Sequence, residues 1–179
     1  MDILFVTTTE KRKLNSLSNG TMLLGTKLIQ AGFSVDIIRF GQYSSYQKDY
    51  QLFISDITND ILRRNPKCVS FYTLWPYYHI CLRVAKKIKQ VNKDIIVVFG
   101  GPQASATAEE TMETFDYVDF VCAGEGENTV VPFFTEVIHN HSSNLSSIAG
   151  LCYRQGDNII KNTQDVTLCN LEELPHWSD

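Results

Sequence analysis

Two short segments rich in glycine are the parts of the sequence best suited to holding a ligand. They are residues 100–106 (GGPQASA) and 124–127 (GEGE). Glycine lets another molecule approach the backbone closely, and free N–H groups at the start of a helix suit polar or anionic groups. Glu125 can accept hydrogen bonds from a ligand, whereas Glu127 suits the positive start of a helix. Each segment alone is equally compatible with an ordinary turn between a strand and a helix.

A cluster of aromatic side chains follows the third apolar run, and aromatic rings just beyond a strand can line a wide, flat pocket. Tyr77 falls on the apolar stripe of the following helix, which predicts core packing. Trp75 and Tyr78 fall off that stripe and are the better candidates for facing a ligand. His79 has no second ligand at metal-site spacing, so a surface or hydrogen-bonded histidine is the simpler interpretation.

No set of catalytic residues stands out. The sequence has no Gly-x-Ser-x-Gly elbow and no His-x-x-x-His pair, and the loop after the first apolar run is neither a P-loop nor a Gly-x-Gly-x-x-Gly turn. The five cysteines are odd in number and widely spaced, which predicts reduced structural thiols rather than disulfides or a zinc site. The sequence therefore predicts a binding domain, with no catalytic and no metal-ligating residue assigned.

Composition argues against several classes of protein. With 16 basic and 20 acidic residues the net charge is −4, and one short basic cluster at residues 11–13 does not make the patch that a nucleic-acid binder carries. No apolar run approaches the roughly 20 residues that cross a membrane, and the start of the chain shows no signal-peptide pattern. We therefore expect one cytoplasmic globular domain, with no nucleic-acid and no membrane partner.

Short apolar runs alternate with amphipathic helices along most of the chain. The runs predict strands at residues 2–7, 35–40, 68–73, 95–99 and 117–122. Apolar residues at helical spacing predict helices at residues 16–31, 49–64, 77–91, 106–114 and 130–138. From Ala149 the pattern changes to two short runs, 151–154 and 158–161, around a turn, which predicts a hairpin.

Five strand–helix units in succession predict an α/β fold with right-handed crossovers between parallel strands. We expect a flavodoxin-like (Rossmann-like) doubly wound sheet of five parallel strands in the order 2-1-3-4-5, with the C-terminal β-hairpin added at its edge. Ligands of such sheets bind outside the carboxyl ends of the strands. The loops expected to form the site are residues 7–15, 72–78, 100–107 and 123–128.

Taken in order, the strand-end segments resemble the cobalamin-binding domain that precedes the catalytic domain in B12-dependent radical S-adenosylmethionine (SAM) enzymes. The segments that carry the resemblance are residues 97–107 (VVFGGPQASAT), 109–111 (EET), 116–121 (DYVDFV), 124–129 (GEGENT), 149–157 (AGLCYRQGD) and 171–175 (LEELP). Each motif is loose by itself, and their order and spacing together make the resemblance specific.

The resemblance implies that cobalamin is the cofactor, with its corrin ring over the strand ends and its dimethylbenzimidazole tail in the crevice. The residues implied to border the tail are Gly100, Gly101, Ser105, Gly124, Glu125 and Gly126. Those implied to underlie the corrin are Thr8, Thr73 and Trp75. The resemblance further implies a partner in cis: a C-terminal radical SAM domain with a 4Fe-4S cluster and S-adenosylmethionine, acting in methyl transfer or radical chemistry.

Two features depart from the family pattern. The loop after the first strand has no histidine, although many cobalamin domains ligate cobalt with one and many radical SAM members do not. The Cys-x3-Cys-x2-Cys motif of the iron–sulfur cluster is also missing. We therefore expect a fragment that is not catalytic by itself: residues 1–147 as the cobalamin-binding domain, and residues 148–179 as hairpin and linker toward a barrel beyond this sequence.

Two alternatives stay open. The missing histidine also fits a non-enzymatic flavodoxin-like docking or regulatory domain that does not bind cobalamin and whose glycine loops are structural. Helix N-termini at the strand ends also suit a nucleotide-sugar or flavin binder, although the sequence carries no phosphate fingerprint.

Overall fold

The computed structural model describes residues 1–8, 18–140 and 142–163. Its strands are β1 (Ile3–Thr7), β2 (Val35–Arg39), β3 (Cys68–Tyr72), β4 (Ile96–Gly100), β5 (Phe120–Cys122), β6 (Leu151–Gln155) and β7 (Asn158–Lys161). They form a single sheet in the order β2-β1-β3-β4-β5-β6-β7. β1 to β5 are parallel, and β6 and β7 add an antiparallel hairpin beside β5. The predicted strand order and the edge hairpin are both confirmed.

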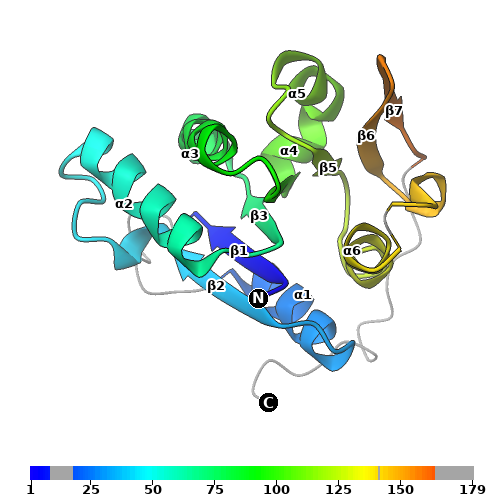
Figure 1. Cartoon of the computed structure of the whole chain (residues 1–179), viewed down its shortest axis with the longest axis horizontal. Helices are drawn as coiled ribbons and strands as arrows, with labels where there is room; N and C mark the ends of the chain where they lie inside the picture. Colours follow the sequence, from blue (N-terminus) through cyan, green and yellow to red (C-terminus); the bar gives the residue numbers. More distant parts are fainter. Residues whose placement is uncertain (9–17, 141, 164–179) are drawn as a thin grey trace.

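Helices cover both faces of the sheet (Figure 1). They are α1 (Asn19–Gln30), α2 (Tyr50–Arg64), α3 (Tyr78–Val91), α4 (Pro102–Ala106), α5 (Ala108–Thr114) and α6 (Val130–Ile138), with 3-10 turns η1 (Phe40–Gln42), η2 (Trp75–Tyr77) and η3 (Leu145–Ser147). α1 and α6 lie on one face, and α2, α3 and α5 lie on the other. None of the helices in the described ranges is long and apolar enough to cross a membrane.

Alternate residues of each parallel strand enter two separate cores. In β1, Leu4 and Val6 pack with α2 and α3, whereas Ile3 and Phe5 pack with α1 and α6. Side chains of successive strand residues point to opposite faces, and here both faces are covered by helices. The strand is therefore apolar without interruption, which is why it is visible in the sequence as a continuous run.

Two predicted elements differ from the structure in detail. The helix expected at residues 106–114 is divided into α4 and α5 at Thr107, whose φ of −129° lies outside the helical range. The strand expected at residues 117–122 is shortened to β5. The regular ladder of β5 does not extend back to Asp119, because a side chain takes part in the pairing there. The Asp119 Oδ2 accepts the Val97 N–H at 2.6 Å, and the Asp119 N–H donates to the Val97 carbonyl at 3.0 Å.

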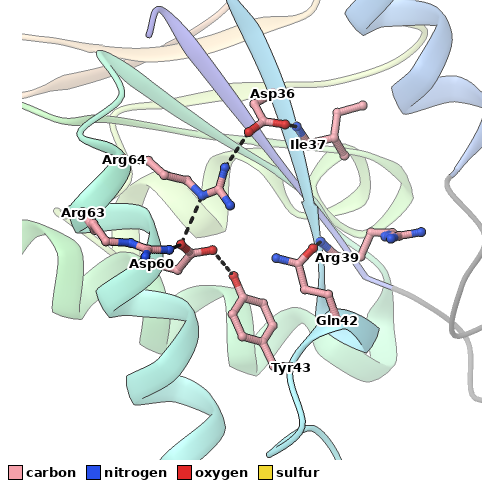
Figure 2. Close-up of polar contacts among 8 residues, drawn as sticks. All are labelled: Asp36, Ile37, Arg39, Gln42, Tyr43, Asp60, Arg63 and Arg64. Carbon is pink, nitrogen blue, oxygen red and sulfur yellow. Dashed lines mark hydrogen bonds and ion pairs between the residues drawn. The ribbon is translucent and has the colours of Figure 1, made fainter.

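A polar cluster centred on Asp60 of α2 ties this helix to the segment after β2 (Figure 2). Tyr43 donates its hydroxyl to Asp60 Oδ2 at 2.8 Å, and Arg63 Nη2 lies 2.5 Å from Asp60 Oδ1. Arg64 bridges Asp60 and Asp36 of β2, at 3.2 Å and 2.5 Å. Burial alone would raise the pKa of Asp60, but the hydrogen bonds from Arg63 and Tyr43 and the charge of Arg64 outweigh it and lower the pKa.

This cluster predicts a pH-dependent contribution to stability. Because the pKa of Asp60 is lower in the folded chain than in the unfolded one, the cluster stabilises the fold at neutral pH and ceases to do so as the pH falls through the folded pKa. We expect Asp60→Asn to lower the free energy of unfolding by about 1–2 kcal/mol at neutral pH. Urea unfolding of both proteins at several pH values measures this difference, which should shrink toward acid pH. The exposed Asp94→Asn variant is the control, and a pH-independent difference would contradict the assignment.

Candidate functional site

A cavity of about 540 Å3 opens at the carboxyl ends of β3, β4 and β5. Its walls come from the sheet face that carries α1 and α6, from the first turns of α1, and from the loop between β5 and α6. This volume falls within the range of small-molecule and cofactor sites. The position is where ligands of doubly wound sheets bind.

Small side chains on one half of the sheet face create the cavity. Tyr72, Gly100 and Cys122 lie side by side in the ladder near the strand ends, and Gly100 contributes no side chain. A Cβ added at Gly100 would come near only the carbonyl oxygen of Cys122, at an ordinary contact distance of 3.7 Å. One step deeper, the small Ser70 also lines the cavity. The absent side chain of Gly100 and the small side chain of Ser70 therefore leave space between the larger lining residues. Nearer the amino ends of the strands the same face is closely packed against α1 and α6.

Gly101 serves a different purpose from its neighbour. Its φ is +91°, and an added Cβ would lie 2.9 Å from the Tyr72 ring and 3.0 Å from the backbone N and O of Thr73. Real Cβ atoms do not approach this closely, so the glycine allows two strand-end turns to touch. Gly101 lines the cavity, but the contact that requires glycine is with the protein itself.

Thr73 connects the turn after β3 to the turn after β4 through two hydrogen bonds. Its hydroxyl donates to the carbonyl of Gly100 at 2.8 Å and accepts the N–H of Ala104 at 3.0 Å. The structure gives Thr73 a supporting role rather than a direct contact with a ligand, because the residue is 0% exposed and does not line the cavity. Thr8, only 6% exposed, donates its hydroxyl to the Tyr72 carbonyl at 3.4 Å and is also outside the cavity lining.

The two aromatic candidates lie in very different surroundings. Trp75 is 79% exposed in η2, beyond the end of β3 and outside the cavity lining. Tyr78 belongs to the opposite core: its ring packs edge-on against Phe99 and its hydroxyl bonds that of Thr111. The expectation that Tyr78 faces a ligand is therefore wrong, because the first turn of α3 directs it onto the sheet.

The loop after β5 completes the cavity wall. The Gly124 N–H donates to the Ser105 hydroxyl at 3.0 Å, which joins the two glycine-rich segments. A Cβ at Gly126 would lie 2.9 Å from the Leu24 side chain, so glycine there lets α1 pack against the loop. Six of the nine predicted site residues thus line one cavity, namely Gly100, Gly101, Ser105, Gly124, Glu125 and Gly126.

Sequence reasoning missed several residues inside the cavity. Phe5 and the α6 residues Phe133 and Phe134 supply apolar surface, and Ser70 and Thr21 supply hydroxyl groups. No glycine or charge marks these positions, and the strand alternation that places Phe5 and Ser70 on one face is the available signal. The cavity therefore suits a mainly apolar, ring-sized group with a few polar atoms.

Cys122 brings a thiol to the cavity wall. Burial raises its pKa to about 12, so the unliganded thiol is neutral at physiological pH. The four cysteines of the described residues are all free, as predicted. In the described ranges, no three His, Cys, Asp or Glu side chains gather as a metal site. His79 stacks on Tyr50 and is not part of the cavity lining.

Comparison with known proteins identifies the family. The sequence model of the B12 binding domain matches residues 8–133, which is well over half of the chain. The chain belongs to this family. Its cofactor is accordingly cobalamin.

Relatives of this B12-binding domain include larger proteins. An uncharacterized methyltransferase, PH0819 of Pyrococcus horikoshii, is 31% identical over 126 residues, covering 69% of this chain and 27% of the relative. Two structures of the radical SAM methyltransferase TsrM from Kitasatospora setae share the fold. One has tryptophan and a SAM analog bound (TM-score 0.68) and one has cobalamin and a [4Fe-4S] cluster bound (TM-score 0.67). Each is 16% identical to this chain in sequence. The match covers 91% of this chain in both cases, but only 30% of the first TsrM chain and 31% of the second. The chain thus spans about a quarter to a third of these proteins.

The cavity of this B12-binding domain fits one part of cobalamin. The corrin ring carries an arm that ends in a ribose and an apolar benzimidazole, and an arm of this kind matches a cavity with aromatic walls and hydroxyl groups. The missing side chain at Gly100 leaves part of that space open. The residues present therefore fit the arm, while the ring itself needs the open surface above the strand ends.

The two neighbouring glycines of this domain should respond differently to the same substitution. Gly101→Ala forces a Cβ against the Thr73 backbone at a positive φ, so we expect a loss of about 2 kcal/mol or more in the free energy of unfolding. Gly100→Ala has room, and its effect should stay within about 0.5 kcal/mol. Urea unfolding of both variants tests this, and equal losses would contradict the assigned roles.

Proposed function

We propose that this chain is the cobalamin-holding module of a B12-dependent radical SAM enzyme. In this proposal the nucleotide arm enters the cavity and the corrin ring lies over the carboxyl ends of the parallel strands. The observation that carries the proposal is the open cavity beside Gly100, at the strand ends of a chain in the B12-binding family. The cavity-lining glycines, Ser105 and Glu125 border the arm, and Thr8 and Trp75 remain proposed neighbours of the corrin.

The radical SAM part of the proposal draws on the relatives. TsrM is a radical SAM methyltransferase whose structure holds cobalamin and a [4Fe-4S] cluster, and the curated relative is also named a methyltransferase. Most of the length of each lies outside the part that this chain matches. We infer that a radical SAM domain in cis supplies the cluster and S-adenosylmethionine, and that residues 148–179 lead toward it.

The residues of this chain bind and orient rather than react. When bound, the corrinoid supplies a cobalt centre for methyl transfer or radical chemistry. Gly100 leaves the arm its entrance, and the contacts of Thr73 and Ser105 hold the strand-end turns in fixed positions around it. Phe133 and Phe134 present an apolar wall that keeps water from the buried end of the arm.

The module holds the corrinoid without a histidine from the loop after β1. The first histidine of the sequence is His79, which lies in α3 against Tyr50. Cys122 brings a thiol to the cavity wall, where burial raises its pKa and so disfavours the ionised form. In the proposed arrangement the affinity comes from enclosing the arm.

Filling the cavity at its entrance tests the proposal. The chain is mixed with hydroxocobalamin, passed through gel filtration and examined for corrin absorbance, and we expect it to retain the corrinoid. In Gly100→Val the added methyl groups project into the cavity, so we expect affinity to fall about tenfold or more while the unfolding midpoint is kept. The matched control also introduces a valine into a strand: Asn158→Val changes an exposed position of β7 outside the cavity lining, and this variant should retain cobalamin.

No retention by well-folded wild-type protein would count against the proposed function. Equal retention by wild type and Gly100→Val would place the corrinoid elsewhere on the molecule. A docking domain that does not bind cobalamin gives the first result, so the experiment also separates that alternative.

A further inference from the structure

Glu127 carries a buried carboxylate oxygen that the protein leaves unsatisfied. The residue lines the cavity, and its Oε2 is out of contact with solvent and has no hydrogen-bond partner within the described part of the chain. The backbone at this position is held firmly, because Lys27 Nζ donates to the Glu127 carbonyl at 2.7 Å. Leu24 packs against the preceding Gly126, so α1 holds the loop through two separate contacts.

An unsatisfied buried acceptor is unusual because nothing compensates for its lost hydration. The neighbouring Glu125 is exposed, so solvent can hydrate its carboxylate. The terminal torsion of a glutamate is broad, so a small rotation of the Glu127 carboxylate suffices to offer an oxygen to a group in the cavity. A carboxylate accepts hydrogen bonds and donates none, so the group it awaits must be an N–H or O–H donor.

We propose that Glu127 accepts a hydrogen bond from a ribose hydroxyl on the arm of the bound corrinoid, and so favours complete corrinoids over cobinamide, which lacks the nucleotide. This inference rests on the proposed function. Within the nucleotide, the glycosylated benzimidazole has no N–H group and the phosphodiester has no proton to donate. The donors that remain are the ribose hydroxyls, so the contact falls on the middle of the arm.

A series of three side chains at one position tests the contact. Glu127→Leu removes both oxygens, and we expect cobalamin affinity to fall about tenfold to a hundredfold, the range for a hydrogen bond to a charged group. Glu127→Gln keeps a neutral carbonyl acceptor, so its cobalamin affinity should lie between that of wild type and that of Glu127→Leu. Cobinamide binding should be the same in all three, because cobinamide lacks the ribose. Affinities are measured by absorbance titration with cobalamin and with cobinamide, and Glu113→Gln, an exposed carboxylate outside the cavity, is the control.

Thermal unfolding without corrinoid separates this role from a structural one. Because the Glu127 oxygen has no partner to lose, neither substitution should lower the unfolding midpoint below that of the control. Unchanged cobalamin affinity in Glu127→Leu, an equal loss of cobinamide, or a lowered midpoint would each overturn the inference. If wild-type protein binds neither corrinoid, or binds both equally, the proposed placement of the arm fails as well. If wild type prefers cobalamin over cobinamide and Glu127→Leu keeps that preference, only the Glu127 inference fails.

Discussion

The Thr73 hydroxyl connects the turns after β3 and β4, and the site depends on this connection. It accepts the Ala104 N–H and donates to the Gly100 carbonyl, so one buried group fixes the start of α4 relative to the end of β4. Gly101 makes the approach possible, since a side chain there would collide with the Thr73 backbone. The strand ends therefore keep a fixed spacing, and Gly100 can present an open space without the turns collapsing into it.

The cavity is a consequence of unequal packing along one sheet face. Near the amino ends of the strands, Ile3 and Phe120 fill the space beneath α1 and α6. Near the carboxyl ends, Gly100 and Ser70 leave it open on the same face. Close packing of the first half carries the stability of the fold. The second half is thereby free to keep a space for a ligand, and the hairpin of β6 and β7 covers the edge of β5.

The fold could be predicted from the sequence because its physical basis is repetitive. Buried parallel strands give continuous apolar runs and surface helices give a period near 3.6, so the order of elements along the chain follows. The strand order follows from the doubly wound fold class that this alternation indicates. The two glycines at 100 and 101 look alike in the sequence, yet one opens a cavity and the other permits a close backbone contact. Only the relative placement of β3 and β4 distinguishes them. For the same reason the family resemblance implies a corrin contact for Thr73, and the helical periodicity suggests a ligand contact for Tyr78, although each is turned toward the protein.

The polar groups of the cavity indicate how affinity and specificity are divided. Apolar rings such as Phe133 and Phe134 favour burial of any flat hydrophobic group, so they contribute affinity with little discrimination. A buried acceptor such as Glu127 rejects ligands that lack a donor, because its desolvation is then left uncompensated. Binding of a complete ligand also stabilises the folded chain by mass action. In the proposed arrangement the space at Gly100 admits the arm, and the unsatisfied oxygen of Glu127 discriminates between arms that carry a donor and those that do not.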